Sequence, residues 1–186
     1  MKLYALLDYE TMLKKEWTIE RFISTCKDLH VEIIQYRDKL GQKERKRDNL
    51  KKIKSLCDIK LLINDDIDLV KYCDGLHVGQ EDLEKISTCK LSAIEKIREK
   101  IGKNFLGIST HNEKEILESN NLDVDYIGLG AYRSTSTKSD AIVLKESLSD
   151  LASLSFKPVG AIGGVRIYDE ISNVTYAVVG SDIYEH

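Results

Sequence analysis

The sequence predicts a single compact (β/α)8 barrel, in which eight parallel strands alternate with helices and close into a cylinder. Two observations support this fold class. Short apolar runs of strand length recur eight times along the 186 residues, and helix-length segments separate most of them. Polar residues or glycines follow nearly every run, where the mouth of such a barrel would lie. The expected strands are residues 3–7, 32–36, 60–63, 75–78, 105–109, 126–129, 159–162 and 176–179.

Helix start signals lie between several of these strands. Thr18 is expected to cap a helix, with Trp17 and Phe22 packing across its first turn. Ser92 and Asn112 are each followed three residues later by a glutamate. This spacing is typical of a capping box and predicts two further helix starts.

The last expected strand is followed only by residues 180–186, so the eighth helix is expected to be a truncated stub. Strands one and eight would then lack their usual cover. A large exposed apolar patch is unusual in a soluble monomer. We therefore expect a homodimer that hides this region.

One domain, residues 1–186, is expected because no linker or low-complexity tract divides the chain, and Pro158 is its only proline. The net charge of −3 gives no electrostatic attraction to nucleic acid or to an anionic membrane. The basic segment 43–54 has Leu50 and Ile53 at helical spacing, which favours an amphipathic barrel helix over a nucleic-acid interface.

The first apolar run, residues 3–7, is too short for a signal peptide or a membrane span, so a cytoplasmic protein is expected. The cysteines form no C-x-x-C pair and have no nearby histidine, which indicates neither a zinc site nor a disulfide framework. They are Cys26, Cys57, Cys73 and Cys89.

The second expected strand ends in a polar motif, Gln35-Tyr36-Arg37-Asp38-Lys39. The two-residue period of a strand places Gln35, Arg37 and Lys39 on the inward face. Burying three long polar side chains without partners is costly, so we expect them to line the open mouth, where two cations and an amide suit a polyphosphate. The alternative is a set of solvent-facing loop residues.

Strands three and four run into carboxylates. Asn64 and Asp65 end the third strand, and Asp82 follows the fourth. A hard cation held by one or two carboxylates and by substrate phosphate oxygens is the usual arrangement for Mg²⁺. The pair Asp65 and Asp82 therefore predicts a magnesium site, although each aspartate alone is typical of a turn or a helix cap.

Glycines follow strands seven and eight, at Gly163-Gly164 and at Gly180-Ser181. Backbone N–H groups there, at the start of short helices, are suited to a monophosphate. The loop 131–138 adds hydroxyls and one ammonium, or else is a flexible polar surface loop.

Seven motifs in order give the chain a close resemblance to the thiamine phosphate synthase family, which shares its barrel with the TenI-type thiazole tautomerases. The motifs are Gln35-Tyr36-Arg37-Asp38-Lys39, Ile63-Asn64-Asp65, Asp74-Gly75-Leu76-His77-Val78-Gly79-Gln80-Glu81-Asp82, Gly107-Ile108-Ser109-Thr110-His111, Asp125-Tyr126-Ile127-Gly128-Leu129-Gly130, Thr135-Ser136-Thr137-Lys138 and Ala161-Ile162-Gly163-Gly164.

The resemblance implies a transferase of thiamine biosynthesis. It would join an aminopyrimidine methyl diphosphate to a thiazole monophosphate and release pyrophosphate, with Mg²⁺ required. The implied catalytic residues are Arg37, Lys39, Ser109 and Lys138, and the implied metal ligands are Asp65 and Asp82. The implied substrate-binding residues are Gln35, Tyr36, Arg37, Asp38, Lys39, Asn64, Ser109 and Lys138 for the pyrimidine diphosphate, and Thr135, Ser136, Thr137, Gly164, Val179, Gly180 and Ser181 for the thiazole phosphate.

The chain departs from the family at several places. Residues 131–134 stand where the synthases usually have a proline and an aromatic residue. The segment from Asp65 to Asp82, the seventh helix and the C-terminus also look shorter than is typical. These departures keep a non-catalytic barrel that binds thiamine precursors as an alternative.

A thiazole tautomerase is the second alternative, with His111 as its acid and base. Arg37, Lys39 and Lys138 favour the synthase, because a tautomerase has no diphosphate to hold. For His77 and His111 the competing interpretation is a hydrogen-bonded polar group at a strand end.

Overall fold

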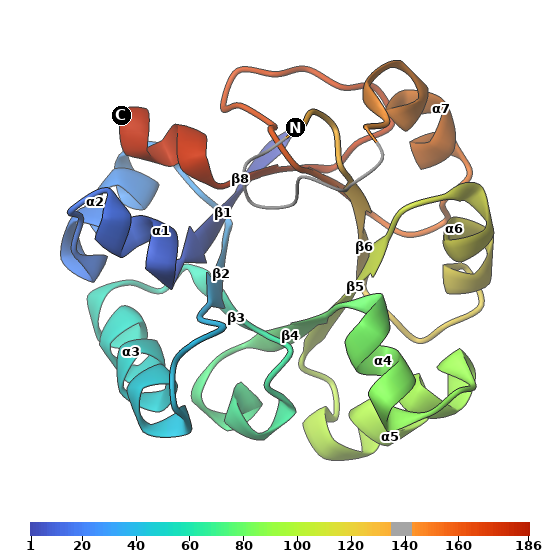
Figure 1. The fold of residues 1–186 in the computed structure, drawn as a ribbon, viewed down its shortest axis with the longest axis horizontal. Coiled ribbons are helices and arrows are strands. Elements are labelled where there is room, and N and C mark those ends of the chain that lie inside the picture. Colours follow the sequence, from blue (N-terminus) through green and yellow to red (C-terminus); the bar gives the residue numbers. More distant parts are fainter. Residues whose placement is uncertain (135–142) are drawn as a thin grey trace.

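The computed structural model describes residues 1–134 and 143–186. Eight parallel strands form a closed barrel in sequence order, and the last strand pairs with the first through Lys2 and Tyr176 (Figure 1). The strands are β1 (Lys2–Asp8), β2 (Ile33–Arg37), β3 (Lys60–Asn64), β4 (Gly75–Val78), β5 (Phe105–Thr110), β6 (Tyr126–Gly130), β7 (Val159–Ile162) and β8 (Tyr176–Val179). The predicted (β/α)8 fold, a TIM barrel, is confirmed.

Helices surround the barrel (Figure 1). The α-helices are α1 (Tyr9–Lys14), α2 (Ile19–Asp28), α3 (Lys43–Leu56), α4 (Gln80–Ile86), α5 (Lys90–Ile101), α6 (Glu113–Ser119) and α7 (Leu148–Ser153), and the 3-10 helices are η1 (Ile67–Tyr72), η2 (Lys145–Ser147) and η3 (Ser181–Glu185). The basic segment forms α3, in which Leu50 and Ile53 are fully buried, as its helical spacing predicted. In the described part of the chain, no helix has the length and apolar character needed to cross a membrane.

Two of the three predicted helix starts are confirmed. The hydroxyl of Thr18 accepts the N–H of Arg21 at 3.2 Å, and the amide oxygen of Asn112 accepts the N–H of Glu115 at 3.0 Å. The prediction at Ser92 is wrong, because α5 begins at Lys90 and Ser92 lies within its first turn. Cys89 is the N-cap residue instead, and its N–H donates to the Ser87 hydroxyl at 3.2 Å.

The strands separate two layers of the core. Alternate residues point into the barrel, where Tyr4, Ile33, Leu62, Tyr126 and Val178 pack together. Their neighbours on each strand point outward and form a larger core against the helices. The inward layer is rich in tyrosine, so the floor of the barrel offers hydroxyl groups as well as apolar surface.

The C-terminal turn covers the outer surface near β1 and β8. Within η3, Ile183 and Tyr184 are 1% and 8% exposed, and the ring of Tyr184 lies 5.0 Å from that of Trp17 and 5.6 Å from that of Phe22. The expectation of uncovered apolar surface here is therefore wrong. The short helix η3 covers this surface with two large apolar side chains, Ile183 and Tyr184. The expected homodimer loses this support and stays a prediction.

Candidate active site

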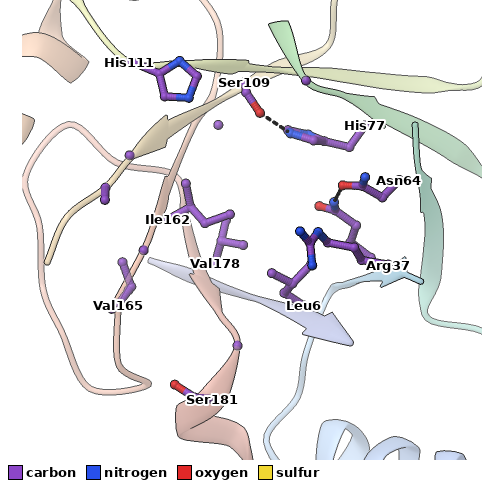
Figure 2. A pocket seen from close by; sticks show the side chains of 18 of the residues that line it. Leu6, Arg37, Asn64, His77, Ser109, His111, Ile162, Val165, Val178 and Ser181 are labelled. Carbon is purple, nitrogen blue, oxygen red and sulfur yellow. Dashed lines mark hydrogen bonds between the residues drawn. The ribbon is translucent and has the colours of Figure 1, made fainter. Parts of the chain in front are cut away.

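A cavity of about 840 Å³ opens at the carboxyl ends of the strands. Figure 2 shows Arg37, Asn64 and His77 on one side of it and Ile162 and Val165 on the other. The predicted site residues that line this cavity are Gln35, Arg37, Lys39, Asn64, Asp65, Asp82, Ser109, Gly164, Gly180 and Ser181, together with His77 and His111. Residues from opposite ends of the sequence thus meet at one mouth.

Three predicted residues lie outside the cavity lining. Strand alternation turns Tyr36 away from the barrel interior, and its hydroxyl donates to Asp38 at 2.9 Å. Asp38 in turn accepts two hydrogen bonds from Arg45, at 2.8 and 2.6 Å. Val179 packs in the outer core, and its neighbour Val178 lines the cavity instead. Thr135, Ser136, Thr137 and Lys138 lie outside the described residues.

The amide groups of Gln35 and Asn64 are held in fixed orientations at the polar side. The hydroxyl of Tyr4 donates to Oε1 of Gln35 at 2.7 Å, and Nε2 of Gln35 donates to Oδ1 of Asn64 at 2.6 Å. Nδ2 of Asn64 then donates to the carboxylate of Asp65. The oxygen and the nitrogen of each amide therefore both have a hydrogen-bond partner, so the orientation of each amide group is fixed.

The same network continues across the barrel floor to Ser109. The hydroxyls of Tyr4 and Tyr126 lie 2.8 Å apart, Nδ1 of His77 lies 2.7 Å from the Tyr126 hydroxyl, and Nε2 lies 3.0 Å from Ser109 Oγ (Figure 2). Burial raises the pKa of Tyr126 well above its usual value, so its hydroxyl stays protonated.

One direction of donation follows from this arrangement. Tyr4 has a single hydroxyl hydrogen, which it gives to Gln35, so Tyr126 donates to Tyr4 and Nδ1–H of His77 donates to Tyr126. When the His77 ring is neutral, its Nε2 accepts from the Ser109 hydroxyl. A continuous chain of donors therefore runs from Ser109 to the carboxylate of Asp65.

Arg37 has a partner that sequence reasoning missed. Its guanidinium forms an ion pair with Asp8, the last residue of β1, and both side chains are largely buried. Asp8 also caps α1, since its carboxylate accepts the N–H of Thr11 at 3.0 Å. A carboxylate at the end of the first strand was the available signal, because the ends of adjacent parallel strands are neighbours.

Asp65 and Asp82 flank one point beside Gly79. Oδ1 of Asp65 accepts the N–H of Gly79 at 3.0 Å. A Cβ atom placed on Gly79 would lie 3.5 Å from a carboxylate oxygen of Asp82 and 3.9 Å from one of Asp65. Burial raises the pKa of Asp65, and the charge of Asp82 raises it further. Asp65 also has a φ of +61°, a strained backbone conformation that is often found at functional sites.

This carboxylate pair fits a divalent cation, which would relieve the repulsion between the two charges. The described residues contain no group of three or more His, Cys, Asp or Glu side chains arranged to hold a metal ion. A cation here would thus need further ligands, such as substrate oxygens. That requirement is typical of Mg²⁺ sites in phosphate chemistry.

The glycine turns lie at the opposite side of the mouth. Gly163 and Gly164 have φ values of +87° and +68°, which residues with a Cβ rarely adopt. Gly180 is followed directly by η3, as expected for a helix-start anion site. The same expectation is wrong after β7, because the described connection 163–175 contains no helix.

Arg133 is a second residue that sequence reasoning missed. It lines the cavity from the stretch 131–134, where the family resemblance predicts a proline and an aromatic residue, and it pairs with Asp169. His111 also lines the cavity, and its Nδ1 lies 3.0 Å from Glu115, the residue that completes the cap of α6. The position of the Arg133 side chain depends on Asp169, which is 36 residues away in the sequence, so no local sequence pattern reveals it.

Comparisons of the sequence and the structure with known proteins agree with one another. The sequence matches the family described as thiamine monophosphate synthase over residues 3–177. It is similar to a thiamine-phosphate synthase of Persephonella marina, with 36% identity over 140 residues that cover 72% of this chain and 63% of that protein. It is also 33% identical to one of Clostridium perfringens over 176 residues, which cover 90% of this chain and 79% of that protein.

A solved structure of a thiamine phosphate pyrophosphorylase from Pyrococcus furiosus has the same fold. Its TM-score is 0.74 at 22% identity, and the match covers 99% of this chain and 90% of that one. The match to the Persephonella marina protein spans just under two thirds of its length.

Proposed function

Because this chain belongs to the thiamine monophosphate synthase family, we propose that it is a transferase that joins an aminopyrimidine methyl diphosphate to a thiazole monophosphate. The products are thiamine phosphate and pyrophosphate. The observation that carries the proposal is that one cavity contains both candidate phosphate regions. It has cations and paired carboxylates at one side and two glycine turns at the other, as two phosphorylated substrates require.

The reaction breaks the bond between the pyrimidine methylene carbon and the diphosphate oxygen, and the thiazole nitrogen forms the new bond to that carbon. No protein nucleophile is needed, because the aminopyrimidine stabilises the cationic methylene group. Catalysis then consists of positioning the two rings and stabilising the leaving pyrophosphate. Leu6, Ile162 and Val178 supply apolar surface between the two phosphate regions.

Arg37 and Lys39 line the cavity beside the carboxylate pair and would take the charge that grows on the leaving group. Ser109 lies at one end of the donor chain, and Gln35 and Asn64 lie near the other. Gln35 would face the pyrimidine, and Asn64 and Ser109 would face the diphosphate. Lys138, by family resemblance, would add a third cation.

Asp65 and Asp82 would hold Mg²⁺, which partly neutralises the diphosphate when it is bound. The raised pKa of Asp65 supports this role, because a buried carboxylate beside a second carboxylate gains from a cation. Gly164, Gly180 and Ser181 would bind the monophosphate of the thiazole at the other side. Thr135, Ser136 and Thr137 would complete that side, by family resemblance.

Incubation of the purified chain with both substrates and Mg²⁺ tests the proposal. A synthase forms thiamine phosphate. A tautomerase interconverts thiazole phosphate carboxylates in the presence of EDTA and loses activity with His111→Ala. A non-catalytic binder retains both precursors unchanged, so absence of thiamine phosphate with both precursors bound would contradict the proposal.

A further inference from the structure

The loop after β6 and the connection between β7 and β8 meet at the glycine side of the cavity, where one arginine joins them. Nη1 and Nη2 of Arg133 donate to the two carboxylate oxygens of Asp169, at 2.6 and 2.9 Å. Nη1 also donates to the backbone oxygen of Gly164 at 2.7 Å, and the backbone N–H of Arg133 donates to the backbone oxygen of Gly163 at 2.8 Å. Arg133 therefore contacts both glycines of the turn.

This turn lacks the support that a barrel usually provides. Most strands of the barrel are followed by a helix, but the described residues 163–175 connect β7 to β8 without one. Gly163 and Gly164 have positive φ values and gain no rigidity from side chains of their own. Other contacts must therefore hold their N–H groups in a fixed direction.

Two carboxylates extend the connection to the other glycine turn. Asp169 accepts the N–H of Arg166 at 2.8 Å, and Asp182 accepts the N–H of Ile167 at 3.0 Å. Asp182 lies in η3, directly after Gly180 and Ser181. Residues 166–167 are thus held between the two carboxylates, and the two glycine turns are linked through side chains.

We propose that Arg133 and Asp169 are positioning residues for the thiazole phosphate, and that their ion pair replaces the missing helix in fixing the Gly163-Gly164 turn. The inference rests on the proposed function. A bidentate arginine–carboxylate pair fixes the orientation of both side chains as well as their distance, which suits a positioning role. The pair lies on the monophosphate side, so its loss leaves the diphosphate side intact.

The alternative role for Arg133 is direct contact with the phosphate, and the two roles predict opposite effects at Asp169. If Arg133 bound the anion directly, Asp169→Asn would leave its charge unneutralised and tighten phosphate binding. If the pair positions the turn, both Arg133→Ala and Asp169→Asn weaken binding. The double variant is then no worse than either single one, because the two residues act as a unit.

The test measures KM for each substrate and the Kd of inorganic phosphate by titration calorimetry. Each single variant should raise KM for the thiazole phosphate by roughly tenfold, as small misplacements of binding groups do. KM for the pyrimidine diphosphate should not change. Arg98→Ala is the matched control, because Arg98 pairs with Asp125 at 2.9 Å at the opposite end of the barrel.

Amide hydrogen exchange over residues 163–169 gives a second readout that does not depend on turnover. Exchange should accelerate in Arg133→Ala and Asp169→Asn but not in Arg98→Ala. If Arg133→Ala does not fold, Arg133→Lys replaces it. This variant keeps the charge, loses the bidentate contact with Asp169 and should still accelerate exchange. Unchanged exchange, tighter phosphate binding in Asp169→Asn, or equal increases in both KM values would overturn the inference. If no thiamine phosphate is formed by the parent chain, exchange and phosphate titration still decide it.

Discussion

Nε2 of Gln35 donates a hydrogen bond to Oδ1 of Asn64 at 2.6 Å, and this contact joins the barrel floor to the carboxylate of Asp65. Tyr4 determines which way the Gln35 amide faces, because its hydroxyl occupies Oε1. The orientation of a substrate-facing amide thus depends on a buried tyrosine that is itself outside the cavity lining.

Tyr4→Phe should lower kcat/KM for the pyrimidine diphosphate by roughly tenfold, since the Gln35 amide loses its fixed orientation. The free energy of unfolding should fall by about 1–3 kcal/mol, because a buried amide oxygen is left without a donor. Steady-state kinetics and urea unfolding measure the two effects. Tyr176→Phe is the control, since Tyr176 packs against Tyr4 and its hydroxyl has no hydrogen-bond partner among the described residues. Equal effects of both variants would argue against the orienting role.

Asp8 pairs with Arg37 and also caps α1, and Asp8→Asn should separate these two roles. Asparagine is also a good helix cap, so α1 keeps its cap, but Arg37 loses its charged partner. We expect inorganic pyrophosphate to inhibit more strongly, because Arg37 is no longer neutralised, and kcat to fall by roughly tenfold, because Arg37 is no longer positioned.

Asp8→Ala should show the same kinetic change and lose a further ~1 kcal/mol of stability with the cap. An unchanged kcat in Asp8→Asn would show that the ion pair does not position Arg37.

Asp65→Asn and Asp82→Asn should each lower turnover by roughly a hundredfold at low Mg²⁺, since a bound metal supplies several kcal/mol of charge stabilisation. Added Mg²⁺ should restore part of the rate, because the remaining carboxylate and the substrate still offer ligands. Asp66→Asn is the matched control, because Asp66 pairs with Lys46 at 3.4 Å and lies outside the cavity lining. Activity that is insensitive to both substitutions would refute the metal assignment.

The stability contributed by Asp169 should disappear in acid. Its hydrogen bonds with Arg133 hold the pKa of the Asp169 carboxyl below its usual value. A carboxyl with a lowered folded-state pKa stabilises the fold above its unfolded pKa, and this stability is lost as pH falls through the folded-state value. The difference in Tm between the parent chain and Asp169→Asn should therefore be largest near neutral pH and shrink below about pH 4. A difference that is constant with pH would show that the ion pair does not stabilise the fold.

The strands were predictable because they are buried on both sides. Continuous apolar runs with turn residues between them locate β4, β7 and β8 at their observed bounds, and the remaining strands to within one residue at either end. The residues at the mouth were predictable from the alternation of inward and outward positions along β2, which places Gln35 and Arg37 on the same face.

Contacts between distant residues could not be predicted from the sequence. Asp8 and Arg37 are 29 residues apart, and Arg133 and Asp169 are 36 apart. Their pairing depends on the closed barrel, which brings separate strand ends together. Tyr184 was likewise missed, because a seven-residue tail gives no periodicity from which to infer that it covers the barrel.

If one cavity condenses the two phosphorylated substrates, the stoichiometry of the products must show it. Pyrophosphate and thiamine phosphate should be measured in the same reaction, with both substrates and Mg²⁺ present. We predict equal amounts of the two products, and neither product when the thiazole phosphate is omitted or the metal is chelated. Pyrophosphate release without thiamine phosphate, or no product with both substrates present, would contradict the account.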